Sequence, residues 1–226
     1  MLGSGTLTTR MGGIYALERL AQDHPKDYHA QIMNLLCAFA RYRTEPEAAS
    51  AADKTGEAEA SKRSEQKCPP DVAAAVKAVG KCRKRLRDKD TLEKIEKGTS
   101  EKSDREPDWT LNLTRVNLTG ADLTGADLTG ADLEDTILVW VDLKGANLKG
   151  AILVGVDLKG ADLEGADLEG VDLTGADLEG ADLTGAIGLT QEMLLSAQPS
   201  SPPKSLPDGL SWPFEEGTDG KWRPKP

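Results

Sequence analysis

The chain has 226 residues, a formal net charge of −10 and only 4% aromatic residues. An aromatic content this low argues against a conventional packed core, and no apolar run reaches the roughly 18 residues that a membrane-spanning helix needs. The N-terminus lacks the basic-then-apolar start of a secretory signal. The three cysteines, Cys37, Cys68 and Cys82, have no CxxC spacing. We therefore expect a soluble, cytoplasmic protein with free thiols.

Helical patterns dominate the first part of the chain. Residues 1–43 predict a helical hairpin, because apolar residues recur at helical spacing and Pro25 starts a second helix. Residues 44–67, rich in Ala, Glu, Lys and Ser, predict a solvated linker. Residues 68–97 predict a further helical segment, and residues 98–108 predict a second linker.

A basic cluster lies in this third helical segment, where the apolar pattern predicts a helix end near residue 87. It consists of Lys81, Arg83, Lys84, Arg85 and Arg87. Cations stabilise a helix C-terminus, so the favoured interpretation is a solvated helix end. A surface for nucleic acid or anionic lipid is the alternative, although no aromatic residues are interleaved with the basic ones.

Residues 111–185 consist of fifteen consecutive five-residue repeats of the pattern Ala-Asp-Leu-x-Gly. Leucine occupies every fifth position from Leu113 to Leu183, with Asp or Asn before it in thirteen repeats and Gly two positions after it in twelve. The run contains 15 acidic and 4 basic residues, and therefore a net charge of −11. The acidity of the protein is concentrated in these repeats.

A period of five fits neither a helix nor a strand. Five helical residues advance by roughly 140° beyond a full turn, which spreads the leucines over every side. In a strand, an odd spacing places successive leucines on opposite faces. The period fits a coil that turns one corner per repeat, with Gly at the position of a type II turn that needs positive φ. The sequence therefore predicts a solenoid with inward leucines and outward aspartates.

The repeat resembles the pentapeptide-repeat family, whose consensus is Ala-Asp/Asn-Leu-x-x. The resemblance implies an all-β solenoid, a right-handed quadrilateral β-helix over residues 109–187, preceded by a small α-helical region. It also implies four repeats per coil, so that Leu113, Leu133, Leu153 and Leu173 stack in one ladder. In addition, the block from Arg10 to Leu20 resembles a segment that precedes the repeats in some bacterial members, where transmembrane helices and membrane association are common.

Two expectations concern the regularity of the repeat. Arg115, Asp135 and Trp140 replace the corner glycine, and we expect their backbone to differ from the glycine corners, because positive φ is uncommon for other residues. The stacked aspartates should repel one another, so added salt or mild acid should raise the melting temperature.

The residues after the repeats predict a cap and a tail. Residues 188–198 predict a C-terminal cap helix, with Thr190 as its N-cap, that covers the open end of the leucine core. Seven prolines occur from Pro199 onwards. Residues 199–226 therefore predict an extended Pro-rich tail.

No reaction is indicated by the sequence. His24 and His29 lack cysteine partners, which makes them weak metal ligands. The glycines recur every five residues rather than as a phosphate-binding loop, and a regular aspartate ladder gives its carboxyl groups no separate catalytic roles. We expect no enzyme activity, no cofactor, no metal and no direct nucleic-acid binding.

Two functions fit this pattern, and a protein–protein interaction scaffold is the first. Apolar residues replace outward polar or glycine positions in two neighbouring parts of the run, and these form the candidate interaction patch: Ile137, Val139, Trp140, Ile152 and Val154. Either the protein's own N-terminal helices or an unknown protein partner would cover it. The alternative is an acidic DNA mimic that binds a DNA-processing enzyme such as gyrase, since roughly three charges per coil match the charge spacing of duplex DNA.

Overall fold

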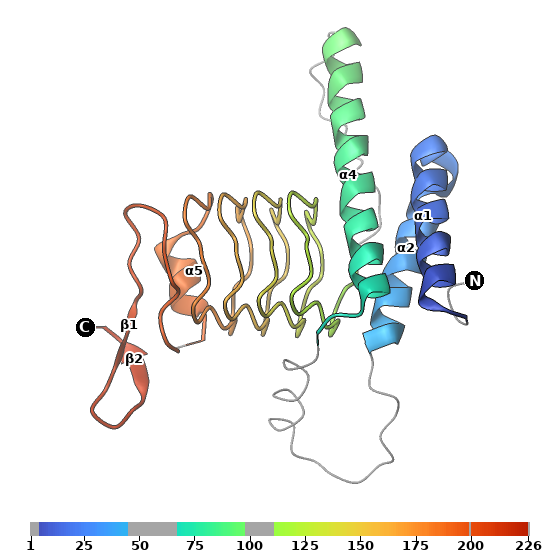
Figure 1. The fold of residues 1–226 in the computed structure, drawn as a ribbon. Helices are drawn as coiled ribbons and strands as arrows, with labels where there is room; N and C mark the ends of the chain where they lie inside the picture. The colour runs from blue at the N-terminus through green and yellow to red at the C-terminus, as the bar shows by residue number, and fades with distance from the viewer. Residues whose placement is uncertain (1–4, 45–66, 98–110, 199, 226) are drawn as a thin grey trace.

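The computed structural model describes residues 5–44, 67–97, 111–198 and 200–225. The helices α1 (Leu7–Asp23), α2 (Pro25–Thr44) and α4 (Pro70–Lys97) precede the repeats. The short helix α5 (Gln191–Ser196) and the strands β1 (Phe214–Glu216) and β2 (Trp222–Pro224) follow them. Figure 1 shows these parts in a row, with the helices at one end of the coils and α5 at the other. The predicted linkers lie almost entirely outside the described residues.

The repeats form a solenoid whose coils pair through isolated parallel bridges. Each bridge joins a residue to the one twenty positions later, from Asn112 with Asp132 to Asp167 with Ile187. Twenty residues are four repeats, so one coil contains four repeats, and this register agrees with the predicted stacking of the leucines. The right-handedness and square cross-section implied by the resemblance stay predictions.

Each repeat ends in a hydrogen-bonded turn. At one of them, the N–H of Ala121 donates to the carbonyl of Leu118 over 2.9 Å. Gly120, at the third position of this turn, has a φ of 67°. Positive φ at this position defines the type II turn that the glycine pattern predicts. The turn directs every repeat leucine inward, and none is more than 2% exposed.

The expectation that non-glycine corners differ is wrong. Arg115, Asp135 and Trp140 have φ values of 59°, 54° and 54°, close to the 58–68° of the glycine corners of the repeats. The backbone N–H of each of these residues also donates to a carbonyl of the following coil, as in the 2.9 Å hydrogen bond from Trp140 to the carbonyl of Lys159. The hydrogen bonds between coils therefore impose the left-handed backbone conformation on three non-glycine residues, for which it costs roughly 1–2 kcal/mol each.

The outward Asp and Asn side chains form a second ladder of local bonds. In all thirteen repeats that have Asp or Asn before the leucine, its Oδ1 accepts the N–H of the residue two positions later. This Asx turn holds the corner in place. The carboxylates are therefore turn-stabilising acceptors as well as repelling charges. Because protonation weakens these acceptors, we now expect acid to lower the melting temperature, contrary to the sequence-based expectation. The expected effect of salt stays a prediction.

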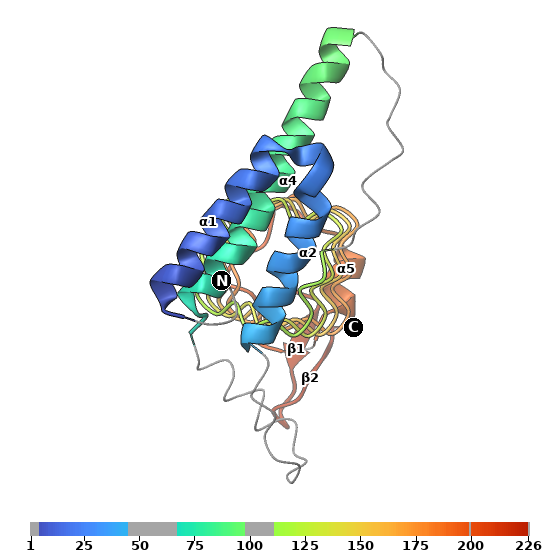
Figure 2. The same ribbon diagram turned by 90° about the vertical axis from the view of Figure 1, so that its right-hand side faces the viewer.

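Helix α4 lies across the first coil, as both views show (Figures 1 and 2). The carbonyl of Gly80 accepts the N–H of Asp127 over 3.4 Å, and the N–H of Cys68 donates to the carbonyl of Thr119 over 3.0 Å. A Cβ at Gly80 would lie 2.8 Å from the Cβ of Ala126, so the helix backbone touches the coil directly. The helix thereby covers the N-terminal end of the leucine core.

A buried carboxylate joins the helices to one another. Asp71, in the first turn of α4, is 1% exposed and pairs with Arg10 of α1 over 2.6 Å and with Arg43 of α2 over 3.3 Å. Although burial opposes its ionisation, the hydrogen bond from Arg10 and the charges of both arginines hold the pKa of Asp71 below its ordinary value.

The C-terminal end of the solenoid is covered by α5. The hydroxyl of Thr190 accepts the N–H of Met193 and caps this helix. Leu194 is fully buried. At the last residue of the helix, the carbonyl of Ser196 accepts the N–H of Gly175 over 2.8 Å, which continues the hydrogen bonding of the last coil.

Residues 200–225 differ from the extended tail that their prolines predict. Ser205 pairs with Asp182 as a further parallel bridge. Trp212 and Phe214 are buried, with their ring centroids 5.2 Å apart in an edge-to-face arrangement. Strands β1 and β2 pair as an antiparallel hairpin. The prolines do not prevent this packing, because the tail pairs with the solenoid only over short stretches. Its packing depends mainly on the burial of two aromatic rings.

Candidate interaction surface

The candidate patch divides into buried and exposed residues. Ile137 and Val139 are 9% and 6% exposed, although their positions in the repeat predict outward side chains. Trp140 and Ile152 are 70% and 42% exposed, and Val154 is intermediate. Of the five residues, only Trp140 and Ile152 are therefore large apolar side chains that solvent reaches freely.

The register places the patch residues on two sides of the solenoid. Ile152 bridges Asp132 and Asp172, whereas Ile137 bridges Asp157 on the next side of the coil. Val154 lies at the corner between these sides, and Trp140 lies at the following corner. The structure therefore distributes the five residues over two sides and two corners rather than on one flat face.

The described residues of the N-terminal helices leave Trp140 exposed. Their described contacts are with the first coil, through Cys68, Lys77 and Gly80 of the segment around α4. Of the two occupants considered for the patch, the described helices therefore do not provide the cover at Trp140. The physical reason is that the open end of the leucine core offers a larger apolar surface than the few apolar residues on the outer faces.

The Trp140 side chain lies over the corner of the next coil. A Cβ at Gly160 would come within 2.2–2.7 Å of three atoms of the Trp140 six-membered ring. Only glycine at position 160 therefore leaves room for the indole in this orientation. The six-membered ring lies against this glycine, while the side chain as a whole remains mostly exposed.

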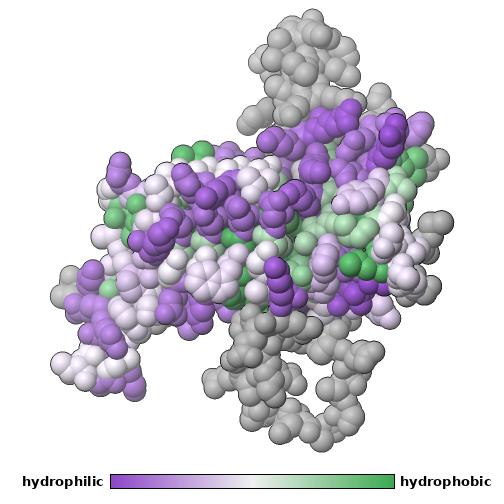
Figure 3. All heavy atoms as spheres, in the orientation of Figure 1, coloured by the Kyte–Doolittle hydropathy of each residue, from purple (hydrophilic) through white to green (hydrophobic). Residues whose placement is uncertain are grey.

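The side of the solenoid that follows the Trp140 corner carries an unbroken aspartate ladder. Asp122, Asp142, Asp162 and Asp182 pair successively as parallel bridges. Lysines bind three of these carboxylates. Figure 3 shows rows of strongly hydrophilic atoms over the face of the solenoid that it presents.

The lysines that bind this ladder come from three parts of the chain. Lys77 of α4 pairs with Asp122, and its hydrogen bond lowers the pKa of Asp122 to about 2. Lys144 pairs with Asp162 over 3.0 Å within the solenoid. Lys204 of the tail pairs with Asp182 over 2.7 Å. Sequence reasoning missed Lys77 and Lys204, because no local pattern relates them to the repeat.

The basic cluster on α4 is not at a helix end. The helix continues to Lys97, so the prediction of an end near residue 87 is wrong. Lys81 lies 3.8 Å from Glu18, and Arg85 donates to Gln22 over 2.8 Å. Part of the cluster therefore joins α4 to α1.

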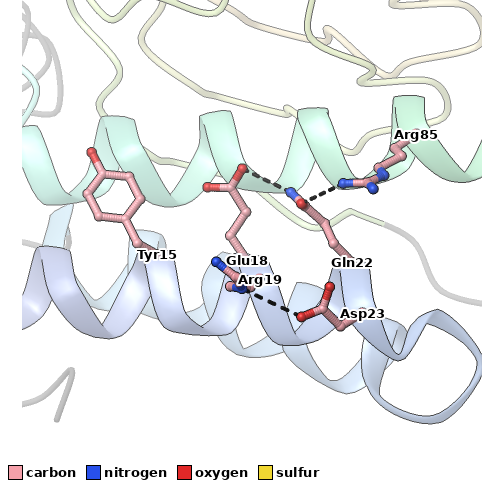
Figure 4. A pocket seen from close by; sticks show the side chains of 6 residues that line it. All are labelled: Tyr15, Glu18, Arg19, Gln22, Asp23 and Arg85. Carbon is pink, nitrogen blue, oxygen red and sulfur yellow. Dashed lines mark hydrogen bonds and ion pairs between the residues drawn. The ribbon is translucent and has the colours of Figure 1, made fainter.

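A shallow depression lies between α1 and α4 and is lined by Tyr15, Glu18, Arg19, Gln22, Asp23 and Arg85 (Figure 4). Its polar side chains pair with one another: Gln22 donates to Glu18 over 3.2 Å, and Arg19 lies 3.6 Å from Asp23. In the described part of the chain, no group of His, Cys, Asp and Glu side chains could hold a metal ion. The depression therefore has the character of a solvated helix surface.

The cysteines are free and buried. Burial raises the pKa of the Cys37 and Cys68 thiols to about 12, and that of the Cys82 thiol to about 11. Thiols with such pKa values are poor nucleophiles at neutral pH. None of the described helices has the length and apolar character needed to cross a membrane.

Comparison with known proteins supports the architecture. The family model for pentapeptide repeats matches residues 112–150 and 151–187, with 8 copies. Residues 112–187 of this chain therefore consist of pentapeptide repeats. The matched residues are the solenoid, whereas the helices and the tail lie outside the match. No curated protein sequence is significantly similar to this chain.

Several solved structures are similar to part of the chain. The pentapeptide repeat protein Rfr23 from the cyanobacterium Cyanothece 51142 is 44% identical over 37% of this chain and 55% of its own, with a TM-score of 0.34. HetL from Nostoc sp. strain PCC 7120, described as involved in heterocyst differentiation regulation, is 41% identical over 34% of this chain and 40% of its own, with a TM-score of 0.21.

A more distant match is QnrB1, a plasmid-mediated fluoroquinolone resistance protein. It is 17% identical over 34% of this chain and 54% of its own, with a TM-score of 0.16. The chain thus spans less than two thirds of the length of each of these three proteins. TM-scores this low support no conclusion about activity or partner.

Proposed function

We propose that the protein is a non-enzymatic scaffold that binds another protein through the solenoid corner at Trp140. The observation that carries this proposal is the combination of exposure and backbone conformation at one residue. Trp140 is 70% exposed and has a φ of 54°. Twelve other repeats have glycine at this position, where the same conformation has no steric cost.

Both features of Trp140 oppose stability. A left-handed conformation at a bulky residue costs roughly 1–2 kcal/mol, and an exposed indole gains little from burial. Strained residues occur preferentially at ligand-binding positions, where the strain serves the function. A large, rigid aromatic side chain is also a typical anchor of protein–protein interfaces. The contact with Gly160 fixes the ring orientation before a partner binds.

The other patch residues have different parts in this proposal. Ile152 and Val154, on the preceding side and corner, would extend the contact. Ile137 and Val139 are buried, so they would support the corner rather than touch the partner.

The acidic DNA-mimic alternative has less support. Three carboxylates of the aspartate ladder are paired with Lys77, Lys144 and Lys204, which reduces the free negative charge on that side. A mimic of duplex DNA needs unpaired charges at regular spacing along its surface. This alternative predicts that a DNA-processing enzyme such as gyrase binds the protein and is displaced by duplex DNA.

The test compares full-length proteins with single corner changes. Trp140→Gly installs the residue that this corner has in most repeats, so the fold should be retained. Arg115→Gly is the matched control, because Arg115 is also an exposed non-glycine corner with a φ of 59°. Proteins captured from cell extract should bind the wild type and Arg115→Gly equally, and Trp140→Gly much less. Equal capture by all three would overturn the proposal.

A further inference from the structure

One position of the aspartate ladder differs from the others. Asp122, Asp162 and Asp182 each pair with a lysine, whereas Asp142 has no ion pair among the described residues. Its Oδ1 accepts the N–H of Lys144 over 3.1 Å in the Asx turn, which leaves Oδ2 for another donor. Asp142 lies two residues after Trp140 in the same coil.

The lysines nearest to this position are directed elsewhere. The ammonium of Lys144 lies 3.0 Å from Asp162 and 3.7 Å from Glu164. Lys159, whose carbonyl accepts the N–H of Trp140, directs its own ammonium to Asp177 over 3.1 Å. Asp142 therefore follows the exposed Trp140 by two residues and makes no ion pair among the described residues, although the charge of the Lys144 ammonium still acts on it.

We propose that Trp140 and Asp142 together bind a lysine side chain from an extended, basic segment of a partner protein. In this arrangement the ammonium of the partner's lysine donates to Oδ2 of Asp142, and the aliphatic part of that side chain or the ammonium itself lies against the indole of Trp140. The inference rests on the proposed function, since it names the chemistry of the segment that the scaffold binds.

The choice of lysine follows from the chain itself. The ladder already binds three lysines that approach from a helix, from the solenoid and from the tail. Equivalent carboxylates in an equivalent backbone should bind a fourth lysine in the same way. The net charge of −11 on the repeats attracts a basic segment over a longer range. The exposed indole adds a cation–π contact that the three internal pairs lack.

The probe is a synthetic peptide of alternating glycine and lysine, and its control is the same peptide with acetylated lysines. Acetylation removes the charge and retains the stem. Binding to the full chain is measured by fluorescence anisotropy of the labelled peptide, and the contact is located by the indole N–H signals in NMR spectra. The Trp140 signal is identified by its loss in Trp140→Gly. The lysine peptide should shift this signal, and the acetylated peptide should not.

Asp142→Asn tests the carboxylate without breaking the turn. Asn112 and Asn147 occupy equivalent positions and make the same hydrogen bond, so the variant should fold. Asp132→Asn is the matched control: it removes the same charge from a different side. We expect the peptide to bind about threefold more weakly to Asp142→Asn and to Trp140→Gly, the size of an exposed charge or cation–π contact. Asp132→Asn and Arg115→Gly should bind like the wild type.

Three results would overturn this inference. The first is a Trp140 signal that the lysine peptide does not shift. The second is equal weakening of peptide binding by Asp142→Asn and Asp132→Asn, which indicates general attraction to an acidic rod, and the third is equal binding of the acetylated peptide. If cell-extract proteins still depend on Trp140, the proposed function stands and only its lysine chemistry fails. If neither those proteins nor the peptide depend on Trp140, both proposals fail.

Discussion

The solenoid and the helical cap are stabilised in different ways. In the solenoid, every coil repeats the same buried leucines, turn bonds and bridges twenty residues apart. In the cap formed by α1, α2 and α4, contacts that do not repeat join the elements, such as the Asp71 carboxylate, the approach of Gly80 to the first coil and an irregular apolar core. A repeated contact can be lost once with a local effect, whereas a unique contact has no neighbour that replaces it.

The largest expected effect is that of Asp71→Ala. The change leaves Arg10 and Arg43 without their carboxylate, and breaking a buried ion pair typically costs about 3–5 kcal/mol. Urea unfolding followed by helical circular dichroism measures the loss. The control is Asp23→Ala, since Asp23 pairs with Arg19 on the surface, where an ion pair contributes about 0–1 kcal/mol. Equal losses would show that the buried pair does not hold the cap together.

Gly80→Ala tests the contact between α4 and the first coil. Alanine is a better helix former than glycine by about 1 kcal/mol, so a loss of stability can come only from the new Cβ. That atom would lie 2.8 Å from the Cβ of Ala126. Overpacking of this kind costs about 1–3 kcal/mol. Gly12→Ala on α1 is the matched control, because nothing lies within 4 Å of its new Cβ. Stabilisation by both changes would mean that α4 is not closely docked.

Corner substitutions should have effects of about 1 kcal/mol each. Gly145→Ala introduces a side chain at a φ of 58° with open space around it, so backbone strain is its only cost. Arg115→Gly removes the same strain and loses only an exposed ion pair with Asp135. Thermal unfolding should show opposite shifts of the melting temperature. Shifts of the same sign would contradict the account of the corners.

The smallest effect per residue is expected from acid. Hydrogen bonds from Lys77 and Lys204 lower the pKa values of Asp122 and Asp182, and one from Thr174 lowers that of Asp172. A lowered folded-state pKa contributes stability above the unfolded value of about 3.9, and this stability disappears as the pH falls through the folded value. Burial raises the pKa of Asp157 and works in the opposite direction.

We therefore expect the melting temperature to fall from about pH 4 to pH 2, as these carboxylates are protonated. Melting curves over this range measure the change. A melting temperature that rises on acidification would restore the interpretation of the ladder as a source of repulsion.

The sequence by itself determined the solenoid. A period of five with leucine, glycine and Asp or Asn at fixed positions specifies a short segment and a turn, because these are contacts between residues close in the chain. The appearance of Asn at Asp positions also contains a signal that was overlooked: Asn112 and Asn147 retain the oxygen acceptor and lose the charge. The acceptor role of this position could have been predicted from that substitution.

Only the tertiary structure decided what covers the solenoid and which outer residues remain free. The burial of Trp212 and Phe214, the docking of α4 at Gly80, and the lysines that reach the aspartate ladder all join segments that are distant in sequence. The exposure of Trp140 and the burial of Ile137 depend on the same arrangement. Local patterns do not contain this information, because a repeat specifies its own corner and its neighbours, whereas docking depends on the shape and charge of surfaces that form only after the coils have stacked.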